Sequence, residues 1–158
     1  MLKPSLRHPS RSSASLSLKL ERWQRRTLYA CLVTLAASGL LWLAAHYWWR
    51  PVTQFGEGIS PFEPWSMKLH GAATMLFLFL LGAMLNTHIR RAIRNRRNLP
   101  SGWVVIGMIT SLTISGYGLY YLAGESARPL WSNLHWIIGI LFIVGLVTHI
   151  VVGRRAIR

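Results

Sequence analysis

Two apolar segments of the chain each carry a histidine near both ends. His70 and His88 lie on the first segment, and His135 and His149 lie on the second. A neutral imidazole is a good metal ligand, and an ionisable side chain within a membrane normally faces the bundle interior, where it has a partner. At about 100° per residue, the 18-residue step on the first segment returns to the same helix face, and the 14-residue step on the second misses it by about 40°. Each helix is therefore expected to direct both of its imidazoles one way.

Four charge-free runs predict the helices that position these histidines. At about 1.5 Å per residue, each is long enough to cross a hydrocarbon layer roughly 30 Å thick. The runs extend from Thr27 to Trp49, from Leu69 to Ile89, from Asn98 to Gly124 and from Pro129 to Gly153. We therefore predict an all-α fold, an integral membrane four-helix bundle over residues 26–155 that follows a basic tail over residues 1–25.

The charges predict how this bundle is oriented. The chain has 18 Lys and Arg against 4 Asp and Glu, and 15 of the basic residues lie in the N-terminal tail, in residues 90–97 and after residue 153. An even number of spans places these three segments on one side, and the positive-inside rule makes that side cytoplasmic, with both termini. Glu57, Glu63 and Glu125 fall on the other side. The basic segments are thus expected to face membrane lipid, and no nucleic acid partner is expected.

The same topology sorts the histidines into two levels. The second and fourth spans run in the same direction, so His70 and His135 are expected at the outer level and His88 and His149 at the cytoplasmic level. Facing imidazoles at each level leave a gap that one iron porphyrin can fill. Bis-histidine ligation of haem suits electron transfer rather than oxygen binding.

Residues between the two levels fit a cofactor-binding interior. Phe77 and Phe142 each follow the first histidine of their helix by seven residues, so both rings are expected to project between the levels. Small residues can let a porphyrin approach the backbone, or can serve only close helix packing. These are Gly71, Gly116, Gly118 and Gly139.

Two features leave the ligand set open. The histidines should be about 27 Å apart along the second span and about 21 Å apart along the fourth, so the levels differ by roughly 3 Å at each end. Either a greater tilt of the second span or tilted haem planes absorb this difference, or only one pair binds iron. His46 lies near the outer end of the first span, close in depth to His70 and His135. It is a replacement outer ligand, an interfacial histidine, or a hydrogen-bond donor to a haem propionate.

The positions of His70, His88, His135 and His149 resemble the ligand layout of four-helix di-haem cytochrome b proteins. This group includes the small bacterial cytochrome b membrane subunits and the haem-bearing half of cytochrome b in quinol–cytochrome c reductase. The resemblance covers residues 27–153; the 14-residue step matches the family's usual separation and the 18-residue step departs from it. It implies two haem b groups in a bacterial inner membrane, which pass electrons between the quinone pool and a redox partner, either a c-type cytochrome or a catalytic subunit.

The single cysteine and the absence of several known motifs exclude some classes of function. Cys31 is the single cysteine, and without a C-x-x-C-H sequence covalent attachment of c-type haem is excluded. The chain has no nucleotide-binding glycine loop, so an electron-transfer subunit is expected rather than a complete enzyme. Glu57 and Glu63 are candidates for a quinone site. The alternatives are a mono-haem cytochrome b, a haem-free membrane interaction or assembly protein, and a transporter with histidine relays. The transporter is disfavoured because the spans contain no Asp, Glu, Lys or Arg.

Overall fold

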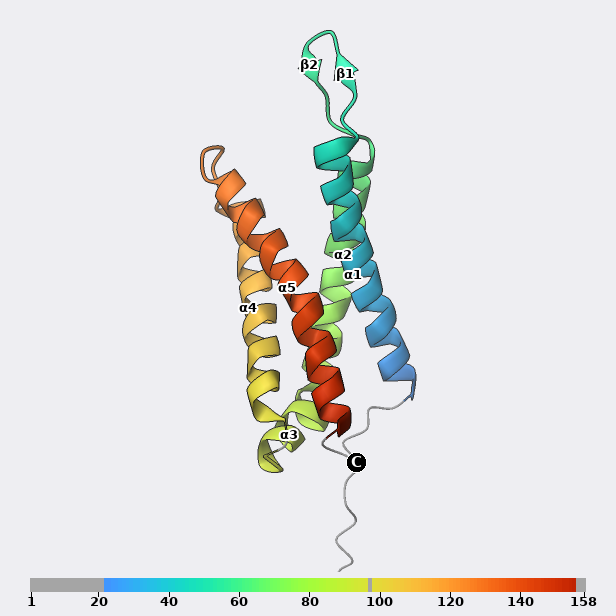
Figure 1. Cartoon of the computed structure of the whole chain (residues 1–158), viewed down its shortest axis with the longest axis vertical. Coiled ribbons are helices and arrows are strands. Elements are labelled where there is room, and N and C mark those ends of the chain that lie inside the picture. The colour runs from blue at the N-terminus through green and yellow to red at the C-terminus, as the bar shows by residue number, and fades with distance from the viewer. Residues whose placement is uncertain (1–21, 97, 156–158) are drawn as a thin grey trace, which may run out of the picture.

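The computed structural model describes residues 22–96 and 98–155, which form two helical hairpins (Figure 1). The first hairpin consists of α1 (Arg22–Trp48) and α2 (Phe62–Met84), and the second consists of α4 (Leu99–Tyr121) and α5 (Arg128–Arg155). A π-helical turn η1 (Leu85–Ile89) and a short helix α3 (Arg90–Arg94) join them. A small antiparallel ribbon of β1 (Val52–Thr53) and β2 (Gly56–Glu57) lies between α1 and α2.

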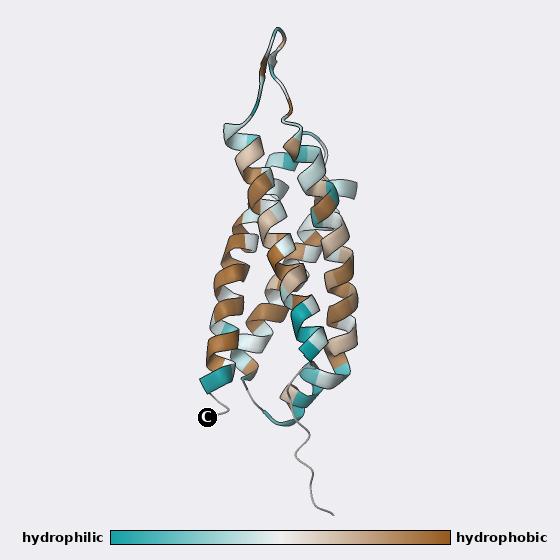
Figure 2. Ribbon diagram, turned by 90° about the vertical axis from the view of Figure 1, so that its right-hand side faces the viewer, coloured by the Kyte–Doolittle hydropathy of each residue, from teal (hydrophilic) through white to brown (hydrophobic). Residues whose placement is uncertain are grey.

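The four predicted helices are confirmed as four helices long and apolar enough to cross a membrane. Hydrophobic residues follow the middle of each helix and hydrophilic residues gather at the two ends (Figure 2). Helix α1 begins at Arg22, inside the segment predicted as a tail over residues 1–25. The rest of that tail, residues 1–21, lies outside the described residues.

The two ends of the bundle carry different structural elements. The "hairpin end" carries the β1–β2 ribbon and the loop between α4 and α5, and the "arginine end" carries α3, the start of α1 and the end of α5 (Figure 1). The three basic segments thus share the arginine end, as far as the structure describes them.

Proline and asparagine residues define where the helices begin. Pro100 and Pro129 lie in the first turns of α4 and α5, where a missing backbone N–H breaks no helical hydrogen bond. Asn98, which precedes α4, has a φ of 52°, a left-handed conformation that asparagine tolerates better than most residues. This residue also contacts the histidine site described below.

The hydrophobic core lies at mid-depth, between the two predicted histidine levels. It contains six buried residues from α1, α2 and α4: Cys31, Ala73, Phe77, Leu80, Val105 and Ile109. Phe142 of α5 packs against this cluster. The prediction that Phe77 and Phe142 project between the levels is therefore confirmed.

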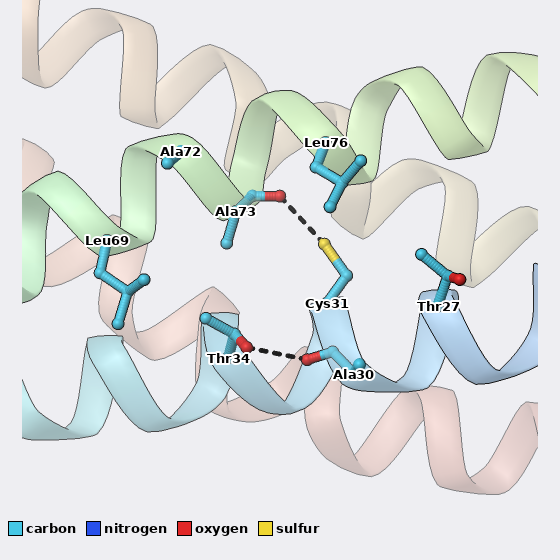
Figure 3. Close-up of a pocket in the computed structure, with 8 residues that line it drawn as sticks. All are labelled: Thr27, Ala30, Cys31, Thr34, Leu69, Ala72, Ala73 and Leu76. Carbon is cyan, nitrogen blue, oxygen red and sulfur yellow. Dashed lines mark hydrogen bonds between the residues drawn. The ribbon is translucent and has the colours of Figure 1, made fainter.

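Helix packing is much closer within each hairpin than between the hairpins. On the α1–α2 seam, the Sγ of Cys31 lies 3.1 Å from the carbonyl oxygen of Ala73, beside a pocket lined by small and apolar side chains (Figure 3). By contrast, none of the described residues of α5 is fully buried by protein. The two hairpins therefore share a core at mid-depth but pack less closely against each other than the helices within each hairpin do.

The second span departs from the predicted regular α-helix at its arginine end. The backbone changes to the π-helical turn η1 at Leu85, and His88 lies within this turn. A π-helical turn holds more residues than an α-helical turn, so it advances less along the axis per residue. This shortening counters the excess length of the 18-residue step relative to the 14-residue step.

Candidate functional site

The structure brings the four predicted histidines together as two pairs, between α2 and α5 at one level and between η1 and α5 at the other. At the hairpin end, the ring centres of His70 and His135 are 6.2 Å apart, with ring planes at 74°. At the arginine end, the ring centres of His88 and His149 are 6.5 Å apart, with ring planes at 86°. These are the pairs that the parallel direction of the two helices predicts.

Both spacings suit a metal ion held between two imidazoles. A metal–imidazole bond is about 2 Å long and the ring centre lies about 1 Å beyond the nitrogen, so two imidazoles on opposite sides of one metal have ring centres about 6 Å apart. The described residues contain no group of three or more His, Cys, Asp or Glu side chains that could hold a metal. Each pair therefore offers two imidazole ligands to a metal.

Serine hydroxyls engage the outward nitrogen of three of the four imidazoles. The Nδ1 of His70 lies 2.9 Å from the Oγ of Ser38 on α1, and the Nδ1 of His135 lies 2.9 Å from the Oγ of Ser115 on α4. Each serine O–H donates to a carbonyl of its own helix, Ser38 to Thr34 and Ser115 to Leu112. The serine oxygen therefore accepts from Nδ1–H, which leaves the Nε2 lone pair of each histidine for a metal.

His149 has the same arrangement with an additional asparagine. Its Nδ1 lies 2.9 Å from the Oγ of Ser101 on α4, whose O–H donates to Asn98. The side-chain amide of Asn98 donates to the backbone carbonyl of His149 at 3.1 Å. The start of α4 therefore holds both the ring and the backbone of His149.

These three serines belong to a repeated dipeptide that sequence reasoning missed. The chain contains three Ser-Gly dipeptides, and each one contacts a different histidine of the two pairs. A Cβ added at the glycine would lie 3.4–3.7 Å from the Cε1 of that histidine, for Gly39 with His70, Gly102 with His149 and Gly116 with His135. The serine contacts Nδ1 of the ring, and the glycine lies beside the ring at a distance where an added Cβ would make an ordinary van der Waals contact. Three Ser-Gly dipeptides within predicted spans were the available sequence signal.

His88 is the exception among the four. Its Nδ1 is buried and has no hydrogen-bond partner among the described residues. Its ring lies in η1, whereas the other three histidines lie in regular α-helix.

The glycines predicted to lie near a porphyrin have different surroundings. Gly116 contacts His135, as described above. Gly118 instead faces Trp131 of α5, with no room for a side chain, because an added Cβ would lie 2.4 Å from the indole ring. No contact lies within 4 Å of an added Cβ at Gly71, and the nearest to one at Gly139 is Leu112 at 3.9 Å.

His46 belongs to a separate polar cluster at the hairpin end. Its Nδ1 lies 3.0 Å from the Oε2 of Glu63 and 2.9 Å from a guanidinium nitrogen of Arg50, and its ring stacks on Trp42. Glu63 is buried between α1 and α2, whereas Glu57 is largely exposed and 3.9 Å from Arg50. The imidazole opposite His70 is that of His135, so His46 does not occupy the position of an outer ligand.

In comparisons with known proteins, no family model, no curated protein and no solved structure matches this chain.

Proposed function

We propose that this protein is a membrane-embedded b-type cytochrome that carries electrons through two haem b groups, each held by one histidine pair. One observation carries the proposal: the second span (α2 with η1) and α5 present two pairs of imidazoles at a spacing that suits axial ligation, one pair near each end of the bundle. The serine contacts at His70 and His135 add support, because they engage Nδ1 and leave the Nε2 lone pair available.

Residues of the protein would hold the two haem groups and keep them apart. Haem iron with two axial imidazoles changes between its ferric and ferrous states and so carries one electron at a time. His70 and His135 would hold one group, and His88 and His149 the other. Phe77 and the apolar core around it fill the space between the two levels and keep water out of it.

The proposed location is a bacterial inner membrane, with both termini in the cytoplasm. Support comes from the basic residues of α3 and of the ends of α1 and α5, which share the arginine end and follow the positive-inside rule. The tryptophans at the hairpin end fit an opposite interface: Trp42, Trp48, Trp49, Trp65 and Trp131. His70 and His135 would then lie toward the outside of the cell.

The proposed partners are the quinone pool and a redox protein, either a c-type cytochrome or a catalytic subunit, for which this chain serves as an electron-transfer subunit. Oxidation of a quinol requires a group that accepts protons. The contact between His46 and Glu63 provides one, about 10 Å along α2 from His70.

The test is the absorption spectrum of the purified full chain. We expect sharp reduced-minus-oxidised bands and two haem b per chain by haem quantification. His149→Ala should remove one haem, His70→Ala or His135→Ala should remove the other, and His46→Ala should retain both. A chain without visible bands overturns the proposal in favour of a haem-free interaction or assembly protein, and one haem per chain reduces it to a mono-haem cytochrome.

A further inference from the structure

The four histidines are not equivalent as ligands, and His88 is the weakest. The Nδ1–H of His70 and of His135 donates to a serine oxygen, and the Nδ1 of His149 lies 2.9 Å from the Oγ of Ser101 and 3.3 Å from the amide nitrogen of Asn98. Such partners fix the orientation of an imidazole ligand. The Nδ1 of His88 is buried and has no hydrogen-bond partner among the described residues. Its ring is therefore less firmly oriented than the ring of His149 across the pair.

The backbone that carries His88 is also the easiest to displace. None of the described residues of η1 is buried. This turn contacts mainly α2 and α3, the segments that precede and follow it in the chain. His149, in contrast, is held through its ring by Ser101 and through its backbone by Asn98. A segment with few buried contacts moves at low free-energy cost, and π-helical turns are common where a helix has a functional irregularity.

We propose that the arginine-end site is a binding site for neutral diatomic ligands of ferrous haem, such as carbon monoxide, with His88 as the ligand that leaves the iron. This inference rests on the proposed function. In the exchange, the bond between iron and the Nε2 of His88 breaks and a bond between iron and the carbon atom of carbon monoxide forms. Each ligand binds through its own lone pair, so the iron stays ferrous and no proton is released. His149 remains bound on the opposite side, while His70 and His135, both held by serines, keep their site closed.

The first test is a carbon monoxide titration of the purified full chain in detergent, with its haem reduced by dithionite. We expect half of the total haem to form the carbon monoxide adduct and the other half to keep its original spectrum. The infrared C–O stretching band identifies the site, because it responds to the histidine on the opposite side of the iron. Ser101→Ala should shift this band, since Ser101 contacts His149, and the matched variants Ser38→Ala and Ser115→Ala should leave it unchanged.

A second variant tests which histidine leaves. In His88→Ala, carbon monoxide should bind at least tenfold faster, because no iron–imidazole bond must break, and the C–O band should match that of the native protein. The inference is overturned by a chain that holds two haems and forms no adduct at saturating carbon monoxide. It is also overturned by a C–O band that shifts with Ser38→Ala or Ser115→Ala. A chain without haem overturns the proposed function itself, so the two failures are distinguishable.

Discussion

At two of the histidines, His70 and His135, a serine hydroxyl indicates which ring nitrogen carries the proton. The O–H of Ser38 or Ser115 donates to a carbonyl of its own helix, so the serine oxygen accepts from Nδ1–H. Ser38 and Ser115 are almost completely buried, 2% and 1% exposed, which is unusual for a hydroxyl unless it has partners. These contacts are the features at the residue scale that most strongly favour a metal at Nε2.

Ser115→Ala tests this role at the hairpin-end pair. The variant leaves the Nδ1–H of His135 buried without an acceptor, and loss of such a partner typically lowers metal affinity by about 10- to 100-fold. We expect one of the two haems to dissociate more readily, as measured by transfer to apomyoglobin. Ser111→Ala is the matched control, because Ser111 lies one turn earlier on α4 and is exposed. Equal haem loss from both variants would contradict the role of Ser115.

Glu63→Gln tests the polar cluster around His46. Glu63 is 7% exposed and contacts both His46 and Arg50, so removal of its charge leaves buried cationic or polar groups without their partner. We expect a loss of about 2 kcal/mol in stability, or roughly 5 °C in the thermal unfolding midpoint. Glu57→Gln should change stability by less than about 0.5 kcal/mol, because Glu57 is exposed. Similar midpoints for the two variants would show that the buried cluster does not stabilise the fold.

At the scale of elements, each antiparallel hairpin supplies a histidine helix and a helix that supports it. Helix α1 supports His70 of α2, and helix α4 supports both histidines of α5. The second hairpin is also closed by Trp131 of α5, which packs directly on Gly118 of α4. Trp131 lies one helical turn before His135 on α5.

Gly118→Ala tests this packing. The added Cβ would lie 2.4 Å from the ring of Trp131, so the indole or the helix must shift. Such overpacking costs about 1–3 kcal/mol, and we expect a lower thermal unfolding midpoint in detergent. Gly107→Ala on the same helix is the control, because nothing lies within 4 Å of its added Cβ. If both variants unfold at the native temperature, the close contact with Trp131 is not important for stability.

At the scale of the whole molecule, charge is separated along the long axis. Most basic residues of the described chain gather at the arginine end, while the β1–β2 ribbon extends from the hairpin end with Phe55 at 90% exposure (Figure 1). A membrane with the proposed orientation would place α3 in the cytoplasm and the ribbon outside the cytoplasm. Cys31, the single cysteine, is buried, so a cysteine added at either end can be labelled selectively.

Cysteine labelling tests this orientation. With a membrane-impermeant maleimide, Phe55→Cys should react in intact spheroplasts, whereas Asn95→Cys should react only after the membrane is permeabilised. The unsubstituted chain, with Cys31 alone, is the control and should remain unlabelled. The reverse pattern would place the arginine end outside and overturn the proposed topology.

The sequence alone determined the number and position of the helices, because long charge-free runs are a local property of the chain. It also predicted which histidines face each other, since helical periodicity and the direction of the second and fourth spans depend only on residue spacing. The partners of those histidines were decided by tertiary structure. Ser38 is 32 residues from His70, and Ser101 is 48 residues from His149. The contact between His46 and Glu63 likewise depends on how α1 and α2 pack, because hydrogen bonds between helices are set by their register and not by local propensity.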